Sequence, residues 1–220
     1  MSAVERAVAF VLADLAGYVA LTEAHGNAEA AGVIERFLAV TRASLAPGAR
    51  LIERVGDQVV VAADDPRAAL QTALQLMSRT TREPLFPSIR VAVHAGPVLE
   101  RDGAYFGAAL NIAARVAAHA QPGQILCTDA LAAASSSLPG IQVRPLGLVA
   151  LRHVVAPVPL FEVTAGPAPS APGTIDPVCH MQLTHESAAA TVRLDGATYY
   201  FCSDSCATAF HRHPAVYIGR

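Results

Sequence analysis

The N-terminal part of the chain carries an unbroken apolar run, residues 7–13, that strongly restricts how it can fold. A run of this length, bounded by polar residues, is typical of a strand buried within a sheet. We therefore expect a buried strand over residues 4–13. The run leads directly into Asp14, so this strand ends on a carboxylate.

A second carboxylate, Asp57, follows Gly56 between two strand-like segments, residues 51–53 and 58–62. A glycine-containing pair between two such segments is typical of a tight hairpin turn. Asp57 is therefore expected where two paired strands meet. Mg²⁺ in proteins usually takes one or two carboxylates, together with phosphates and water, and Asp14 and Asp57 fit that demand.

An amide and a guanidinium group, Asn111 and Arg115, lie four residues apart in an expected helix over residues 108–119, and so share one face. Two carboxylates followed by this pair suit a site that handles a nucleoside triphosphate with two divalent cations. Each residue also has a simpler interpretation: Asp14 as a helix cap, Asp57 as part of a turn, and the other two as surface side chains. The joint pattern favours the nucleotide site.

The order and local contexts of these four residues resemble the class III adenylate/guanylate cyclase catalytic domain over residues 4–163. The resemblance implies an α+β fold with a ferredoxin-like βαββαβ core. It also implies a homodimer that forms a 3′,5′-cyclic nucleotide from ATP or GTP with Mg²⁺ or Mn²⁺. In such a dimer Asp14 and Asp57 of one chain hold the metals. Asn111 and Arg115 of the other chain orient the ribose and stabilise the phosphoryl charge.

The rest of this region alternates between helical and strand periodicity. A helix is expected over residues 19–45, because apolar residues recur at helical spacing before Pro47-Gly48, which stops a helix. Pro66 opens the next helix. The other expected elements are strands over 89–93, 123–128, 141–151 and 158–163, helices over 66–77 and 108–119, and a loop over 96–107 that contains Gly96-Pro97 and Gly107. His94 and Cys127 lie in apolar strand contexts and are expected in the core.

Two positions depart from the adenylate cyclase pattern. Glu53 stands where adenylate cyclases usually carry Lys, and Ala104 where they carry Asp or Thr. A carboxylate can accept the N1 and N2 hydrogens of guanine, whereas Ala104 forms no hydrogen bond, and a missing bidentate contact costs about 1–3 kcal/mol. Arg152 is a candidate cation facing the phosphates. A catalytically decayed, cyclase-like binding domain is the alternative to an active enzyme.

The composition excludes several functional classes. Of 220 residues, 53% are apolar and 15% are charged, which provides ample material for a core. The net charge of −2, without any run of Lys or Arg, argues against a nucleic-acid or anionic-membrane partner. The N-terminal apolar run is too short to span a bilayer, and the first residues lack the basic start of a signal peptide. The sequence therefore predicts a cytoplasmic protein.

A Pro/Ala/Gly-rich segment, residues 165–173, separates two regions of different composition. Such a linker is extended and semi-stiff and buries nothing, so the predicted domains are residues 1–164 and 174–220. The linker is also expected to let the C-terminal domain move independently. Three of the four cysteines lie in residues 174–220.

The C-terminal segment contains several motifs: Asp176-Pro177-Val178-Cys179-His180-Met181, Tyr199-Tyr200-Phe201-Cys202-Ser203, Cys206 and Phe210. These motifs resemble the YHS domain, a relative of the TRASH metal-binding modules. One residue departs from the family, because His180 stands where Gly is common. Asp195-Gly196 is expected to form a hairpin turn. Ser203 is expected to cap a helix that holds the Cys202 and Cys206 thiols near its N-terminus.

Three thiols in so small a domain, those of Cys179, Cys202 and Cys206, favour a soft metal ion, Zn²⁺ or Cu⁺, which also stabilises a small core. The sequence leaves the fourth ligand open among His180, His185, Asp176, His211 and His213. Two alternatives remain: a disulfide between Cys202 and Cys206, which is rare in a reducing compartment, and a reduced cluster packed around aromatic residues. The C-terminal domain is expected to sense a metal or to tune the cyclase.

Overall fold

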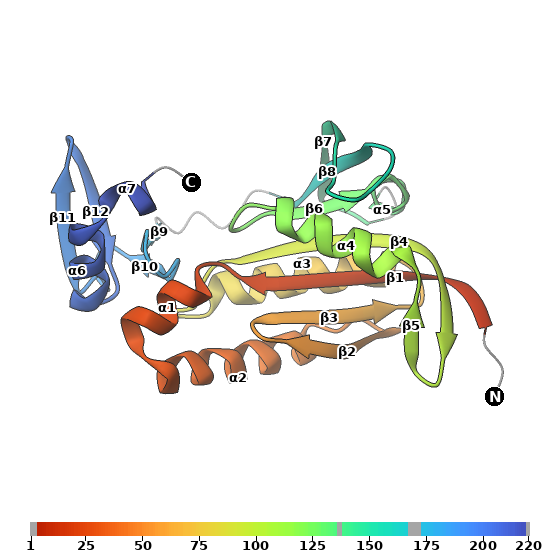
Figure 1. Ribbon diagram of the computed structural model, residues 1–220, viewed down its shortest axis with the longest axis horizontal. Coiled ribbons are helices and arrows are strands. Elements are labelled where there is room, and N and C mark those ends of the chain that lie inside the picture. Colours follow the sequence, from red (N-terminus) through yellow and green to blue (C-terminus); the bar gives the residue numbers. More distant parts are fainter. Residues whose placement is uncertain (1–3, 136–137, 167–172, 219–220) are drawn as a thin grey trace.

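Figure 1 shows the computed structural model, which describes residues 4–135, 138–166 and 173–218. The larger domain contains, in chain order, β1 (Val4–Leu15), α1 (Tyr18–His25), α2 (Asn27–Ala43), β2 (Ala49–Val55), β3 (Gln58–Ala63), α3 (Pro66–Arg82), β4 (Ile89–Arg101), β5 (Ala104–Phe106), α4 (Ala108–His119), β6 (Ile125–Thr128), α5 (Asp129–Ser135), β7 (Ile141–Val149) and β8 (Val158–Ala165). The smaller domain contains β9 (Gly173–Ile175), β10 (Gln182–Thr184), β11 (Ala190–Leu194), β12 (Ala197–Phe201), α6 (Asp204–Arg212) and α7 (Pro214–Tyr217).

The described strands of the larger domain form one sheet in the order β2-β3-β1-β4-β6-β8-β7, with β5 paired to β4. The first four strands of this order are antiparallel to their neighbours, and the helices α1–α2 and α3 connect them. This is the expected ferredoxin-like βαββαβ core. β6 then extends the sheet by pairing parallel to β4, and β8 and β7 complete it.

The middle of strand β1, residues 8–13, is apolar throughout because both faces of the sheet are covered at its position. Ala9 and Val11 pack into the core on the side of α2 and α3, whereas Val8, Phe10 and Leu12 pack on the side of α4. Side chains that alternate between two covered faces require an unbroken apolar run. This explains why the run ends only at Asp14, where the strand emerges at the edge of the core.

Two expectations about the larger domain are wrong. The helix expected over residues 19–45 is two helices, because Gly26 adopts φ 85° and ψ 165° and breaks the chain between α1 and α2. The loop expected over residues 96–107 is a hairpin: β4 continues to Arg101 and folds back through β5. The sequence analysis also missed α5, whereas α4 spans the expected residues.

The smaller domain has the two local features that its sequence predicts. Asp195 and Gly196 both have positive φ, 49° and 81°, and join β11 to β12 in a hairpin. This geometry matches a two-residue turn whose twist suits the paired strands. Ser203 caps α6, because its Oγ accepts a hydrogen bond from the Cys206 N–H at 3.2 Å.

A short segment of the smaller domain pairs with the chain that leads into β4. Ser88 donates its N–H to the His180 carbonyl at 2.9 Å, and Gln182 donates its N–H to the Phe86 carbonyl at 3.1 Å. These backbone bonds hold the two domains together, so an independently moving C-terminal domain does not fit the structure. The greater part of the expected linker, residues 167–172, lies outside the described residues.

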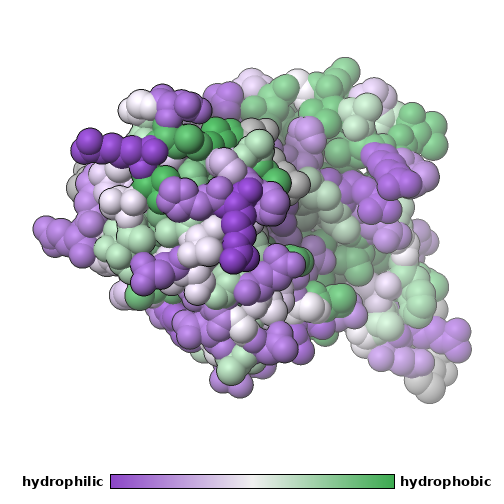
Figure 2. All heavy atoms as spheres, turned by 60° about the vertical axis from the view of Figure 1, so that its left-hand side comes forward, coloured by the Kyte–Doolittle hydropathy of each residue, from purple (hydrophilic) through white to green (hydrophobic). Residues whose placement is uncertain are grey.

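The two domains also share apolar packing. One core cluster includes Leu21 of α1 and Phe86 from the larger domain, together with Val178, Cys206 and Phe210 from the smaller one. Figure 2, which turns this side of the molecule forward, shows hydrophilic and hydrophobic residues interspersed over the surface. The smaller domain therefore buries its aromatic and thiol groups in a core that is continuous with that of the larger domain.

Gly17 and His180 lie in close contact at the boundary between the two domains. Gly17 precedes α1 with φ 69°, and a Cβ atom placed there lies 2.5 Å from His180 Cδ2 and 3.3 Å from the Val178 carbonyl oxygen. His180 itself has φ 57°, a conformation that glycine adopts without strain, which explains why glycine suits this position in YHS domains. The missing Cβ of Gly17 makes room for the imidazole of His180.

None of the helices in the described part of the chain has the length and apolar character needed to cross a membrane.

The tight contact at Gly17 generates a stability prediction. Gly17→Ala is expected to destabilise the protein more than Gly123→Ala, because both residues have positive φ, 69° and 79°, but the space around Gly123 is open. The left-handed backbone costs about 1–2 kcal/mol in either variant. The clash with His180 adds about 1–3 kcal/mol to the first alone. Equilibrium urea unfolding measures the loss of unfolding free energy in each variant. Equal losses in the two variants contradict a close fit between the domains at Gly17.

Candidate functional site

The two carboxylates expected at strand ends lie together. Asp14, near the end of β1, pairs in register with Gln58, the first residue of β3, and Asp57 is the turn residue just before it. The pKa of Asp14 rises to about 6, first because the side chain is largely buried and then because the Asp57 carboxylate is adjacent. Two acidic groups held this close together repel each other and attract a cation.

Arg90 completes this part of the site, and the sequence analysis missed it. It lies opposite Asp14 in the β1–β4 ladder, and its Nη2 donates to Asp14 Oδ2 at 2.6 Å. The ion pair lowers the pKa of Asp14 and offsets part of the effect of burial. The Nε of Arg90 is buried without a hydrogen-bond partner. A charged residue at the start of an otherwise apolar strand was the available signal.

Asn111 and Arg115 project from the exposed side of α4, as their four-residue spacing predicts. Together with Arg152 and His153 they line an open pocket of about 570 Å³. In the described part of the chain, no hydrogen bond or ion pair joins this pocket to Asp14 or its neighbours. Within one chain the residues expected to act together therefore form two groups, one carboxylate and one cationic.

The two residues at which the sequence departs from adenylate cyclases are both exposed. Glu53 lies on β2, opposite Val60 and just after a bulge in the ladder, and Ala104 begins β5. Neither side chain takes part in a hydrogen bond or ion pair in the described structure, so the Glu53 carboxylate is free to meet a ligand.

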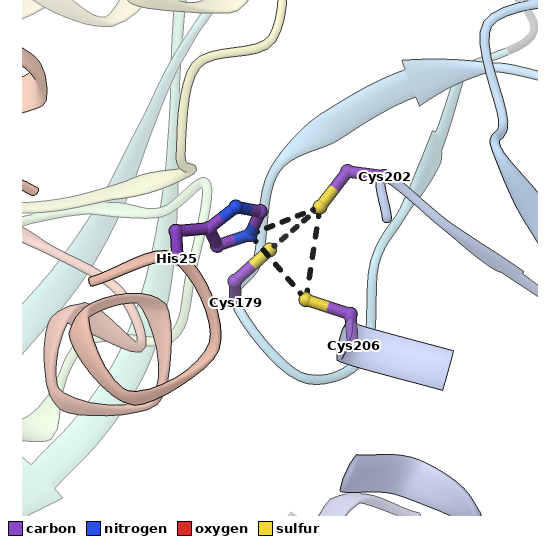
Figure 3. A group of neighbouring side chains, drawn as sticks. All are labelled: His25, Cys179, Cys202 and Cys206. Carbon is purple, nitrogen blue, oxygen red and sulfur yellow. Dashed lines mark hydrogen bonds between the residues drawn. The ribbon is translucent and has the colours of Figure 1, made fainter. Parts of the chain in front are cut away.

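The three cysteines of the smaller domain converge, as Figure 3 shows. The Sγ atoms of Cys179 and Cys202 are 3.4 Å apart, and those of Cys202 and Cys206 are 3.7 Å apart. The Nε2 atom of His25, at the end of α1, lies 3.3 Å from the Cys202 sulfur and 3.5 Å from that of Cys206. The four donor atoms all lie within 4.8 Å of one another.

These spacings are those of a tetrahedral site. With Zn–S bonds near 2.3 Å and Zn–N bonds near 2.05 Å, the edges of the tetrahedron are about 3.8 Å between sulfurs and about 3.6 Å between sulfur and nitrogen. The separation between Cys202 and Cys206 exceeds the length of a disulfide bond, about 2.05 Å, and all four cysteines are free. The disulfide alternative is therefore wrong for this structure.

None of the five candidates for the fourth ligand belongs to this cluster. Asp176 is fully buried, and its carboxylate accepts the N–H groups of Val178 and Cys202, both at 2.8 Å, so it positions the loops that carry two of the cysteines. His180 packs against Gly17, and His185 stacks on Tyr200 with ring centroids 4.4 Å apart. His211 and His213 are exposed.

The sequence analysis missed His25 because it searched for ligands only within the small domain. A histidine next to Gly26, a residue able to break a helix, was the available signal.

Hydrogen bonds among the three thiols shift their acidity. Those from the Cys179 and Cys202 thiols lower the pKa of Cys206 to about 5. Hydrogen bonds with Cys202 and with Cys206 raise the pKa of Cys179 above its usual range. A thiolate within a compact sulfur and imidazole cluster is a suitable ligand for a soft metal. Cys127, by contrast, is a core residue as expected, and burial raises its pKa to about 12.

Comparisons with known proteins agree with this division. Residues 174–220 match the YHS domain. Over 164 residues, 73% of the chain, the sequence is 32% identical to a pH-sensitive adenylate cyclase of Mycobacterium tuberculosis. It is 38% identical over 129 residues, 58% of the chain, to an adenylate cyclase of Glutamicibacter nicotianae. The chain spans 41% and 31% of these two relatives.

Among solved structures, the adenylyl cyclase CyaB from P. aeruginosa superposes on 78% of this chain over 100% of its own length, with a TM-score of 0.67 and 17% identity. The larger domain therefore has the fold of the class III nucleotide cyclase catalytic domains. The smaller domain is a YHS domain, so the chain joins a cyclase-type catalytic fold to a C-terminal YHS domain.

The raised pKa of Asp14 predicts a pH-dependent stability. Its folded-state pKa, about 6, lies above the ordinary value of 3.8, so the folded state binds the proton more tightly. The stabilisation is complete below the ordinary pKa and is lost as the pH rises through about 6. Without divalent cations, the melting temperature of the wild type should therefore fall more between pH 5 and pH 7 than that of Asp14→Asn. Equal decreases in melting temperature for the two proteins contradict a raised pKa at Asp14. Because both proteins keep Asp176, whose pKa is also raised, its contribution cancels in the comparison.

Proposed function

We propose that this chain is a nucleotide cyclase that forms a 3′,5′-cyclic nucleotide from ATP or GTP. The observation that carries the proposal is the convergence of Asp14 and Asp57 at one edge of a cyclase-type sheet. Two relatives that match the larger domain are named adenylate cyclases, which points in the same direction. The cationic pocket around Asn111 and Arg115 supplies the complementary chemistry.

Asp14 and Asp57 would hold Mg²⁺ or Mn²⁺. The fit rests on the local chemistry: two hard carboxylates lie side by side, and burial and then the proximity of Asp57 raise the pKa of Asp14. A bound cation relieves this penalty on the charged form. Bound there, two divalent ions make the ribose 3′-hydroxyl more acidic and neutralise the leaving pyrophosphate. Arg90 fixes Asp14 Oδ2 and so orients the carboxylate.

The residues of the cationic pocket act on the substrate directly. The guanidinium of Arg115 places a permanent charge beside the phosphoryl group as charge accumulates in the transition state. Asn111, one helical turn away on the same face, hydrogen bonds to the ribose and directs its hydroxyl toward phosphorus. Arg152 lines the same pocket and holds the outer phosphates.

A homodimer would join the two groups of residues. In the described part of one chain no hydrogen bond or ion pair joins the carboxylates to the cationic pocket, although the proposed chemistry needs both around one phosphoryl group. A two-fold symmetric dimer brings the carboxylates of one protomer to the pocket of the other and forms two such sites. Val155, an apolar side chain fully exposed at the rim of the pocket, suits such an interface.

Base recognition would favour guanine. The exposed Glu53 carboxylate can accept the two hydrogens of the guanine edge, a pattern that adenine does not offer. Ala104 adds no hydrogen bond, so discrimination between GTP and ATP is expected to be modest. Ala104 also favours the second candidate function, a cyclase-like domain that binds a nucleotide without turnover. In both cases the YHS domain binds a soft metal ion through its three cysteines.

The first prediction of this proposal tests turnover and the composite site. Purified chain with Mn²⁺ or Mg²⁺ should convert ATP or GTP to cyclic product, and Asp57→Ala and Arg115→Ala should each lose at least about 100-fold in kcat. Mixing these two inactive variants should restore about a quarter of wild-type activity, since half of the dimers are mixed and each has one intact site. Mixed dimers that form without recovering activity contradict a shared site. Absence of product from the wild type favours the binding domain.

The second prediction concerns the base. Glu53→Lys should shift the ratio of kcat/KM for GTP over ATP toward ATP by about 10-fold or more, because a bidentate contact is worth about 1–3 kcal/mol. Arg54→Lys, a substitution at the exposed neighbouring position on β2, is the matched control and should leave the ratio unchanged. A strong preference of the wild-type enzyme for ATP contradicts a role of Glu53 in base recognition.

A further inference from the structure

The thiol cluster of the YHS domain is completed by a residue of the other domain. Cys179, Cys202 and Cys206 all belong to the YHS domain, whereas His25 is the last residue of α1 in the larger domain. Figure 3 shows the imidazole reaching from the end of α1 into the group of sulfur atoms. The cluster therefore lies at the junction of the two domains.

The break at Gly26 is what makes this position possible. A continuous helix through residues 19–45 would carry His25 as an interior residue, with its imidazole lying along the helix side. The extended conformation of Gly26 instead ends α1 at His25 and turns the chain into α2. The imidazole at the free end of α1 then reaches Cys202 and Cys206 at 3.3 and 3.5 Å.

The other polar groups near the cluster already have partners. The Asp176 carboxylate accepts backbone N–H groups on both loops that carry the first two cysteines. The Ser203 hydroxyl caps α6. Among the residues that the structure describes, His25 is therefore the imidazole whose donor atom points at the three sulfurs. With the cysteines it forms the Cys₃His ligand set that structural zinc sites use.

We propose that one Zn²⁺ or Cu⁺ ion, held by Cys179, Cys202, Cys206 and His25, joins the YHS domain to helix α1 of the cyclase domain. The inference extends the soft-metal binding proposed above by assigning a fourth ligand and by placing the ion between the domains. The ion then connects the two domains of the chain rather than stabilising the YHS domain alone.

The YHS domain and the bound ion together hold α1 at both of its ends. At its start, Gly17 packs against His180 and Val178 of the YHS domain, and at its end His25 binds the ion. α1 begins four residues after Asp14, so its position sets the direction in which the chain leaves the carboxylate site. Because a metal ion that binds only the assembled site stabilises the assembled state, its occupancy controls how firmly α1 is held.

The experiment uses the full chain with three measurements. Zn²⁺ affinity and stoichiometry are measured by competition with a chromophoric chelator, and the visible absorption of the Co²⁺-substituted protein reports the ligand set. Hydrogen exchange of residues 18–25 is compared with and without Zn²⁺. The variants are His25→Gln, the double variant Cys202→Ser/Cys206→Ser and, as matched control, His211→Gln, an exposed histidine of the YHS domain.

Wild type and His211→Gln should bind one Zn²⁺ per chain, with Zn²⁺ slowing exchange in α1. His25→Gln should bind at least about 10-fold more weakly, with an altered Co²⁺ spectrum and no slowing in α1. The double cysteine variant should bind no Zn²⁺. Wild-type affinity and spectrum in His25→Gln overturn the inference while leaving the three-cysteine site intact. A wild type that binds no metal overturns both the role of His25 and the three-cysteine metal site. Neither result bears on the cyclase proposal, which the turnover assay tests separately. Circular dichroism of the metal-free variants confirms that they fold.

Discussion

The hydrogen-bond ladders on both edges of β1 determine the position of the carboxylate site. They place Asp14 opposite Gln58 on β3 and opposite Arg90 on β4, and so beside the hairpin turn that carries Asp57. Because side chains alternate along a strand, a slip of one residue would turn Asp14 to the opposite face. Because both faces of β1 are buried and apolar, polarity does not oppose such a slip; the packing of the large Phe10 and Leu12 side chains on the α4 side does. A reactive group at the end of a strand is thus positioned by residues that take no part in chemistry.

Opposing charges make this site sensitive to what binds nearby. Burial and Asp57 raise the pKa of Asp14, Arg90 lowers it, and the net effect is an acidic pair that a divalent cation would stabilise. The same Arg90 lowers the pKa of His180, although burial contributes more. One guanidinium therefore lies between the carboxylate site and the YHS domain, so the two regions share an electrostatic environment as well as a core.

Sequence patterns predicted the parts of this protein that depend on local chemistry. The buried β1, the face of α4 with Asn111 and Arg115, and the cap at Ser203 all follow from spacing and residue type within a few positions. The contributions of Arg90 and His25 depend on contacts between segments far apart in the chain, so the local signals, a charged residue in a strand and a histidine beside a glycine, do not identify their partners. The break at Gly26 was missed because helical periodicity continues on both sides of it.

The contact between Gly17 and His180 implies that the two domains are shaped for each other. The cyclase domain lacks a side chain at Gly17, and the YHS domain places the imidazole of His180, a residue with φ 57°, in the space this leaves. A chimera that carries a YHS domain with glycine at this position would leave a void at the seam, and one that carries a larger residue in place of Gly17 would be forced apart. Exchanging either domain between chains of this architecture therefore requires transplanting both sides of the seam together.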